Sequence, residues 1–346
     1  MAIQNYSTPT ASRNLINTEF EMLKRVESIQ VLGKFGDQKT QPLNKTDTAV
    51  FRRLDPFNVD ANGLPQITAA NFVGAEGTTP TSNTISYTDV TATVEQYNVL
   101  FKFSSKAELM YEDDIPADMR TVTADTLAEV AELVAYGQMK AGTSVIYANG
   151  TTRAGLNTRI SLAKLQLAAR SMESNRATHV TSMIGPGPNF NTAPCEPAFI
   201  VFHHTDASSD VKALSGFTKR VEYGSAVTPV HPREIGACDQ FRFVPSPLFK
   251  PYVTAGSSTT NGMVATSGSV DVYPFIIIGE SAMGHISLKG NGYTGISPTI
   301  ISSKVKNHAN PSAKFGYVGA DFWYAAVRLN ENWMTRLEAG VTDLAL

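Results

Sequence analysis

Residues 84–103 read TISYTDVTATVEQYNVLFKF, and they have the pattern of an unusually long β-strand. Tyr97, Val99, Phe101 and Phe103 lie at every second position, which is the period of a half-buried strand. Such a strand would span roughly 65 Å at about 3.3 Å per residue. A compact chain of 346 residues has a radius of gyration of only about 20 Å. An unbroken strand must therefore protrude from the subunit, bend, or do both.

The apolar positions of this strand change phase near its middle. Val90, Ala92 and Val94 occupy even positions, whereas the apolar residues from Tyr97 onward occupy odd ones. This change predicts a bulge or twist, or apolar contacts on both faces. A protruding strand has no core of its own, so we expect neighbouring chains to cover part of it.

A second strand is predicted at residues 48–54 (TAVFRRL), and it can pair with part of the long strand. Residues 55–83, between the two, are rich in Pro, Gly, Asn and Thr and are too long for a tight turn. We therefore interpret residues 46–103 as one long β-hairpin with an irregular tip.

Two adjacent arginines, Arg52 and Arg53, lie on the first strand of this hairpin. Adjacent residues of a strand point to opposite faces, so the two guanidinium groups should separate. One hypothesis is an exposed edge strand protected by charge. The other is that the arginines pair with acids of a neighbouring subunit, and the sequence leaves both hypotheses open.

The rest of the chain predicts an α+β fold. A helix at residues 19–31 ends at Gly36, and a polar link follows at 37–47. Asp114 and Pro116 begin a long helix at 117–141, with Met119, Val122, Leu127, Val130, Leu133 and Val134 as its apolar stripe. Further helices are predicted at 161–174 and 206–217, loops at 182–197 and 255–269, and strands at 198–203, 240–244, 270–279, 284–288, 319–329 and 333–338.

The composition limits the possible functions. Charged residues make up 17% of the chain and the formal net charge is −2, which argues against a DNA-condensing protein and suits wide buried contacts. The two cysteines, Cys195 and Cys238, form no disulfide framework, so we expect a reducing compartment. We expect no signal peptide and no membrane span.

Sequence motifs give little support for catalysis, and we expect no catalytic, cofactor-binding or metal-binding residues. The Gly-rich stretch at 290–295 matches a dinucleotide motif but is followed by Pro298 instead of a helix, so we interpret it as a turn. We interpret His203 and His204 as a strand end capped by Asp206, and the acids at 112–114 as a helix start. The two thiols are expected to be inert.

Several short blocks, in this order along the chain, carry a family resemblance. They are Lys34-Phe35-Gly36; 50–54 (VFRRL); 90–97 (VTATVEQY); the acid-led helix from Asp114; Gly142-Thr143-Ser144 with Tyr147-Ala148; Tyr273-Pro274-Phe275 with Gly279; 325–331 (AAVRLNE); and Arg336-Leu337-Glu338. Together they resemble the major capsid proteins of tailed phages, specifically the family typified by N-four-like short-tailed phages.

This resemblance implies the Hong Kong ninety-seven capsid fold and the following division of the chain. The N-terminal arm is residues 1–45, and the extended loop is the hairpin 46–103. The peripheral domain is 104–197 and includes the spine helix 117–141. The axial domain is 198–309, and C-terminal strands at 310–346 return to the peripheral domain.

The resemblance also implies a function: a structural protein that forms hexamers and pentamers, the capsomers of an icosahedral shell around double-stranded DNA, bound without sequence specificity. The expected location is the virion, after assembly in the bacterial cytoplasm, with a separate scaffold, a portal and a decoration protein as partners. The expected intersubunit contacts are Phe51, Arg52, Arg53, Tyr87, Glu95 and Tyr97. The alternatives are an encapsulin-like compartment, which a neighbouring cargo-enzyme gene would favour, and an enzyme of mixed α/β type.

Overall fold

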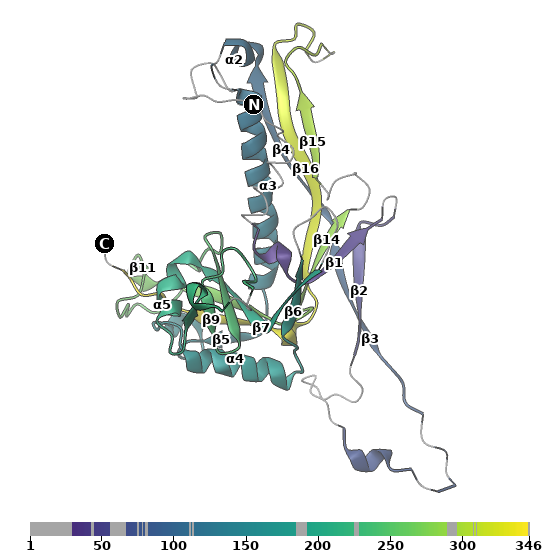
Figure 1. Cartoon of the computed structure of the whole chain (residues 1–346), viewed down its shortest axis with the longest axis vertical. Helices are drawn as coiled ribbons and strands as arrows, with labels where there is room; N and C mark the ends of the chain where they lie inside the picture. Colours follow the sequence, from purple (N-terminus) through teal and green to yellow (C-terminus); the bar gives the residue numbers. More distant parts are fainter. Residues whose placement is uncertain are drawn as a thin grey trace.

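The computed structural model describes residues 30–42, 45–55, 67–74, 76–77, 79, 82–110, 112, 114–184, 192–224, 228–288, 296–306, 308 and 310–344. The molecule has three parts (Figure 1): an upright layer with a long helix, a rounded mixed part, and a hairpin that points away from both. The Gly-rich stretch at 290–295 and most of the helix predicted at 19–31 lie outside the described residues. None of the described helices is long and apolar enough to cross a membrane.

A five-stranded sheet forms the upright layer, and its central strand is β16 (Phe315–Arg328). Strand β4 (Glu95–Ser104) pairs antiparallel with β16 from Phe315 to Tyr324. Strands β14 (Met283–Leu288) and β15 (Ile296–Ile301) also pair antiparallel with β16, in succession along its length. The edge strand is β1 (Asp37–Gln41), which pairs parallel with β14.

Strand β1 corrects the prediction of a polar link at 37–47. Its sequence, DQKTQ, has no apolar alternation, and its first four side chains are exposed. The strand forms because its backbone pairs with the largely buried β14, and this pairing leaves no signal in the side-chain pattern.

The long helix α3 (Ile115–Lys140) packs against the five-stranded sheet, and the short helix α2 (Ser105–Met110) precedes it. Asp114 caps α3 as expected, since its carboxylate accepts a hydrogen bond from the Ala117 N–H at 3.2 Å. The predicted apolar stripe is partly wrong, because Val122 is 50% exposed and Leu133 is 40% exposed. The buried face instead carries several alanines, which let the helix lie close to the sheet: Ala124, Ala128, Ala131 and Ala135.

An eight-stranded mixed sheet forms the core of the rounded part. Its order is β5 (Val145–Tyr147), β17 (Met334–Ala339), β13 (Tyr273–Ile278), β7 (Thr192–His204), β10 (Phe241–Ser246), β9 (Gly236–Cys238) and β8 (Thr218–Lys219), and β6 (Val180–Ile184) also pairs with β7. Helix α4 (Leu162–Ser174) covers one face, and the end of α3 packs with Phe35 over the other.

Several predicted boundaries in this part differ from the structure. Strands β6 and β7 extend into the predicted loop 182–197, and the predicted helix 206–217 is reduced to α5 (Ser208–Lys212). The predicted loop 255–269 contains a small β-ladder of β11 (Ala265–Thr266) and β12 (Ser269–Val270). The short 3-10 helices are η1 (Leu32–Lys34), η2 (Ala69–Phe72), η3 (Arg153–Gly155), η4 (Thr205–Ala207), η5 (Arg220–Glu222) and η6 (Glu331–Trp333).

The hairpin consists of β2 (Thr48–Leu54) and β3 (Tyr87–Thr93), which pair antiparallel as predicted. The single long strand predicted at 84–103 is interrupted at the buried Val94, where the predicted phase change occurs. Alternate residues turn inward at even positions in β3 and at odd positions in β4. The paired hairpin therefore ends at Thr93, and residues 95–103 belong to the five-stranded sheet.

Gly36 joins η1 to β1 in a conformation that only glycine adopts easily, with φ of +88°. A Cβ atom there would lie 2.5 Å from the Met283 carbonyl oxygen. We predict that Gly36→Ala lowers the free energy of unfolding by about 2 kcal/mol or more. The measurement is chemical denaturation of the purified chain.

Gly137→Ala is the matched control, because Gly137 lies inside α3 with open space around its Cα. This change should raise the free energy of unfolding by about 0.5–1 kcal/mol. Equal effects of the two substitutions would contradict the assigned role of Gly36.

Candidate functional site

The hairpin has two different faces. Its inner face rests on the five-stranded sheet, where Ala49, Phe51 and Ala92 pack with Ile286 and Ala325. Its outer face, defined here as Val50, Arg52, Leu54, Tyr87, Asp89 and Thr91, is exposed to solvent. The strand alternation thus separates the two arginines, as the sequence predicts.

The inner face is fixed by contacts within the subunit. The Arg53 guanidinium donates to the Leu329 carbonyl at 3.3 Å, and the Lys39 ammonium donates to the Val50 carbonyl. The Phe51 ring lies over Gly284, where a Cβ atom would come within 2.9 Å of the ring. Phe51 and Arg53, two of the predicted intersubunit contacts, therefore hold the hairpin on its own sheet.

The outer face carries a bidentate ion pair between directly opposite residues. Arg52 donates to the two carboxylate oxygens of Asp89 at 2.7 and 2.8 Å. These hydrogen bonds lower the pKa of Asp89 and raise that of Arg52. The Tyr87 ring centre lies 5.8 Å from the Arg52 guanidinium carbon. An exposed pair of this kind contributes little to stability.

The tip of the hairpin exposes apolar side chains that the sequence analysis did not single out. Ile67, Phe72, Val73 and Ile85 are all more than half exposed. Figure 1 shows the tip far from both sheets. A two-stranded ribbon alone is marginally stable in water, and clustered exposed apolar residues mark interaction surfaces. The sequence does contain an indication of this surface: the apolar residues of ITAANFV (67–73) interrupt an otherwise polar segment.

The remaining two candidates, Glu95 and Tyr97, lie on β4, away from the outer face. The Tyr97 hydroxyl donates to the Glu95 carboxylate at 3.0 Å, and its ring centre is 5.4 Å from that of Phe322. Tyr97 also packs on the core between β16 and α3. The six predicted contact residues therefore do not form one surface, and only Arg52 and Tyr87 share the outer face.

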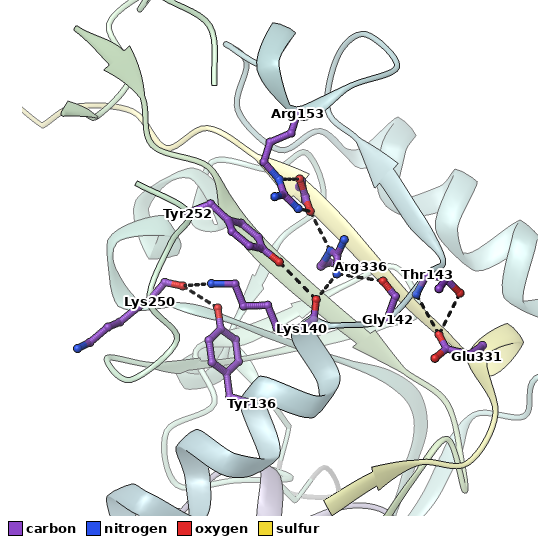
Figure 2. A network of polar contacts seen from close by, with 10 residues as sticks. Tyr136, Lys140, Gly142, Thr143, Arg153, Lys250, Tyr252, Glu331 and Arg336 are labelled. Atoms are coloured by element: carbon purple, nitrogen blue, oxygen red, sulfur yellow. Dashed lines mark hydrogen bonds and ion pairs between the residues drawn. The ribbon is translucent and has the colours of Figure 1, made fainter. Parts of the chain in front are cut away.

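A dense cluster of charged groups joins the end of α3 to β17 (Figure 2). The fully buried Glu338 carboxylate accepts hydrogen bonds from Arg153 at 2.6 and 2.7 Å and from Arg336 at 2.8 Å. Arg336 also donates to the carbonyls of Lys140 and Gly142. The Lys140 carbonyl is at the end of α3 and has no helical partner, and the Gly142 carbonyl lies just beyond the helix, so Arg336 satisfies both and complements the helix dipole.

Tyr252 occupies the centre of this polar junction (Figure 2). Its ring centre lies 3.8 Å from the Lys140 ammonium and 3.6 Å from the Arg153 guanidinium carbon. Burial, together with the charges of Arg153 and Arg336, lowers the pKa of Lys140. The polar atoms of the junction are engaged in hydrogen bonds, ion pairs or cation–π contacts, which indicates a structural role.

The other residues considered for chemistry also have structural roles. His203 is buried with its Nδ1 atom 2.7 Å from the His204 carbonyl oxygen, and burial lowers its pKa to about 4. We predicted Asp206 as the cap at this strand end, but the cap of η4 is His204, whose Nδ1 atom accepts a hydrogen bond from the Asp206 N–H. Cys195 and Cys238 are unpaired, and burial raises the pKa of both thiols. The described residues contain no group of three or more His, Cys, Asp or Glu that could hold a metal ion.

Comparison with known proteins gives a clear result for the fold. No protein-family model matches the sequence, and no curated protein is similar to it. The capsid of Ralstonia phage GP4 is similar over 99% of this chain and 96% of the GP4 capsid chain, with a TM-score of 0.63 and 11% sequence identity. The chain has a phage capsid fold.

Two further structures support this conclusion. The head structure of Helicobacter pylori bacteriophage KHP40 is similar over 98% of this chain and 97% of the KHP40 chain, with a TM-score of 0.59 and 10% sequence identity. The Cyanophage Pam1 capsid is similar over 99% of this chain and 98% of the Pam1 capsid chain, with a TM-score of 0.58 and 11% sequence identity. The predicted α+β capsid fold is confirmed, whereas the N-four-like family and the subdomain limits remain predictions.

The polar junction generates a prediction about stability. Glu338→Gln removes the one negative charge that faces Arg153 and Arg336, so it should lower the free energy of unfolding by roughly 3 kcal/mol. Chemical denaturation at neutral pH measures this change. Glu173→Gln, on the exposed side of α4, is the control and should leave the midpoint unchanged. A Glu338 variant as stable as this control would show that the junction is dispensable.

Proposed function

We propose that this chain is the major capsid protein of a tailed bacteriophage. In this proposal it assembles into the icosahedral head shell that encloses the double-stranded DNA genome. The observation that carries the proposal is a match over 99% of this chain and 96% of a phage capsid chain. The exposed apolar tip of the hairpin supports the same conclusion, because a subunit made to assemble needs surface that its neighbours cover.

The proposed mechanism is geometric and involves no catalysis. The inner face of the hairpin fixes its direction on the five-stranded sheet, and the outer face and tip lie on a neighbouring subunit. The rounded part, which contains much of the proposed axial domain at 198–309, closes rings of identical subunits into hexamers and pentamers. The proposed peripheral domain at 104–197, with the strands at 310–346, connects the rings.

The proposal includes partners and a location. We expect a separate scaffold protein, a portal and a decoration protein, and packaged DNA that is bound without sequence specificity. The protein would be assembled in the bacterial cytoplasm and would remain in the virion. Within the subunit, Arg52 and Tyr87 are the residues whose placement best suits contact with a neighbour.

The hairpin tip provides the first test of this function. In electron micrographs the full chain should form polyhedral shells, tubes or rings, whereas a variant lacking residues 57–79 should form none. The deletion leaves both paired strands and their inner contacts in place, so the variant should unfold at nearly the wild-type denaturant concentration.

Two outcomes would contradict the proposal. Normal particles from the deletion variant would exclude a role for the tip in assembly. A full chain that remains a monomer, or a shell that encloses an enzyme cargo instead of DNA, would exclude the capsid function itself.

Arg52 provides a second prediction. Arg52→Glu places two carboxylates opposite each other on an exposed surface, so it should lower the yield of shells at least tenfold while shifting the thermal midpoint little. The double variant Arg52→Glu with Asp89→Arg restores an ion pair within the hairpin in reversed order. If Arg52 binds an acid of a neighbour, the double variant should still assemble poorly. Full recovery of assembly would show that only the internal pair matters.

A further inference from the structure

Three of the six histidines are buried, and they come from three different parts of the fold. His203 is near the end of β7, His231 lies in the loop between η5 and β9, and His285 is on β14. In a neutral imidazole one ring nitrogen donates a hydrogen bond and the other accepts one, whereas in the charged ring both donate. The partners of each ring therefore show which form the fold accommodates.

His231 is held in its neutral form by two hydrogen bonds. The backbone N–H of Arg233 donates to its Nδ1 atom at 3.0 Å, so Nδ1 carries no proton. Its Nε2 atom lies 3.3 Å from the Gln30 carbonyl oxygen, which only accepts, so Nε2 is the donor. A second proton on this ring would have to displace the Arg233 N–H.

His285 has the same division between its two nitrogens. Its Nε2 atom lies 2.9 Å from the Phe35 carbonyl oxygen and donates to it. Its Nδ1 atom lies 2.6 Å from the Tyr324 hydroxyl, and in the neutral ring it accepts the hydroxyl proton. Tyr324 in turn faces Glu132 on α3 and Tyr97 on β4.

These two histidines act on the same short segment. His231 donates to the carbonyl of Gln30 and His285 to that of Phe35, so the rings hold the two ends of residues 30–35. One ring belongs to the rounded part and the other to the five-stranded sheet. Neutral imidazoles therefore help to join these two parts of the molecule.

His203 lies in the core of the rounded part. Its Nδ1 atom donates to the His204 carbonyl oxygen at 2.7 Å. Its Nε2 atom is buried and has no hydrogen-bond partner within the described part of the chain. The ring centre lies 5.7 Å from that of Phe275 and 6.1 Å from that of Phe243. A second proton on Nε2 would therefore be a buried charge without an acceptor, which is strongly unfavourable.

The charged groups near these rings oppose a further positive charge. Lys34, Arg220 and Arg233 all face His231 and disfavour its charged form. His204 acts on His203 in the same sense. No cation in these sets could be replaced by a protonated imidazole without added repulsion.

The nearby carboxylates are engaged elsewhere. Glu132 accepts hydrogen bonds from the backbone N–H groups of residues 31 and 32. Glu234 accepts from the Val230 N–H at 2.6 Å and from the Tyr223 hydroxyl at 2.7 Å. Among the described residues, no carboxylate forms a hydrogen bond or ion pair with any of the three buried rings.

We propose that the fold carries an acid limit: the folded subunit requires neutral His203, His231 and His285, so protons destabilise it just below neutral pH. Unfolding exposes the three rings to water, where each takes up a proton. The effect is on the stability of the whole chain and needs no rearrangement within the folded subunit. This inference does not depend on the proposed function, because it concerns one subunit.

The sign of the pH effect follows from linkage. Burial lowers the pKa of each of the three histidines to about 4, from an ordinary value of 6.5. Between these values the unfolded chain binds more protons than the folded chain, so stability falls as the pH drops below 6.5. From about pH 7 to about pH 5.5 each histidine should raise the unfolding constant about eightfold, and the three together about five-hundredfold.

Urea denaturation of the full-length, unassembled chain at several pH values between these limits tests the proposal. The variants are His231→Gln and His285→Gln, which keep a neutral donor, and His203→Phe, which keeps an aromatic ring beside Phe243 and Phe275. In each variant the rise of the unfolding constant should be about eightfold smaller than in the wild type. All other titrating groups are shared, so the difference belongs to the replaced ring.

His308→Gln is the matched control, because His308 is exposed, and it should keep the wild-type rise. A wild-type unfolding constant that stays level or falls as the pH drops, or buried-histidine variants that retain the full rise, would overturn the proposal. If the variants do not fold at neutral pH, the wild-type slope decides. Near pH 5.5 it should correspond to about two to three protons taken up on unfolding, and fewer than about two would contradict the acid limit.

Discussion

The pairing of β4 with β16 is the interaction on which the rest of this structure depends. It joins residues 95–104 to residues 315–324, more than two hundred positions apart in the chain, and builds the centre of the five-stranded sheet. Helix α3 lies on this sheet through alanines, and the inner face of the hairpin rests on its other end. The paired strands thus set where both the long helix and the hairpin lie.

Two buried acids connect the parts of the molecule around this sheet. Glu338 neutralises Arg153 and Arg336 where α3 ends against the eight-stranded sheet. Glu132 lies on α3, about two turns before the end of the helix, and accepts hydrogen bonds from the backbone N–H groups of residues 31 and 32. Both carboxylates accept several N–H groups, which offsets the cost of removing them from water. The same long helix therefore serves as the common support for segments that are distant in sequence.

Local patterns in the sequence predicted the features that depend on neighbouring residues. The change of phase predicted an irregularity in the strand near Val94, although not that the chain leaves the hairpin there, and Asp114 with Pro116 located the start of α3. The alternation on β2 predicted that Arg52 and Arg53 would face opposite ways. Each of these inferences rests on the geometry of a single strand or helix.

Features that depend on distant residues were not predictable in this way. Strand β1 exists because of β14, and the partners of Arg52 and Arg53 are set by the hairpin register and the position of Leu329. The exposure of Val122 and Leu133 reflects which side of α3 meets the sheet, and that side places alanines between larger buried residues such as Leu127. Apolar periodicity alone gives too much weight to large side chains.

The contacts of the inner face run along the ladder from Ala49 to Arg53, so the paired part of the hairpin is fixed to the five-stranded sheet. The tip lies beyond these contacts (Figure 1). A small change of direction at the end of the ladder, where Arg53 donates to Leu329, is therefore enlarged at the tip.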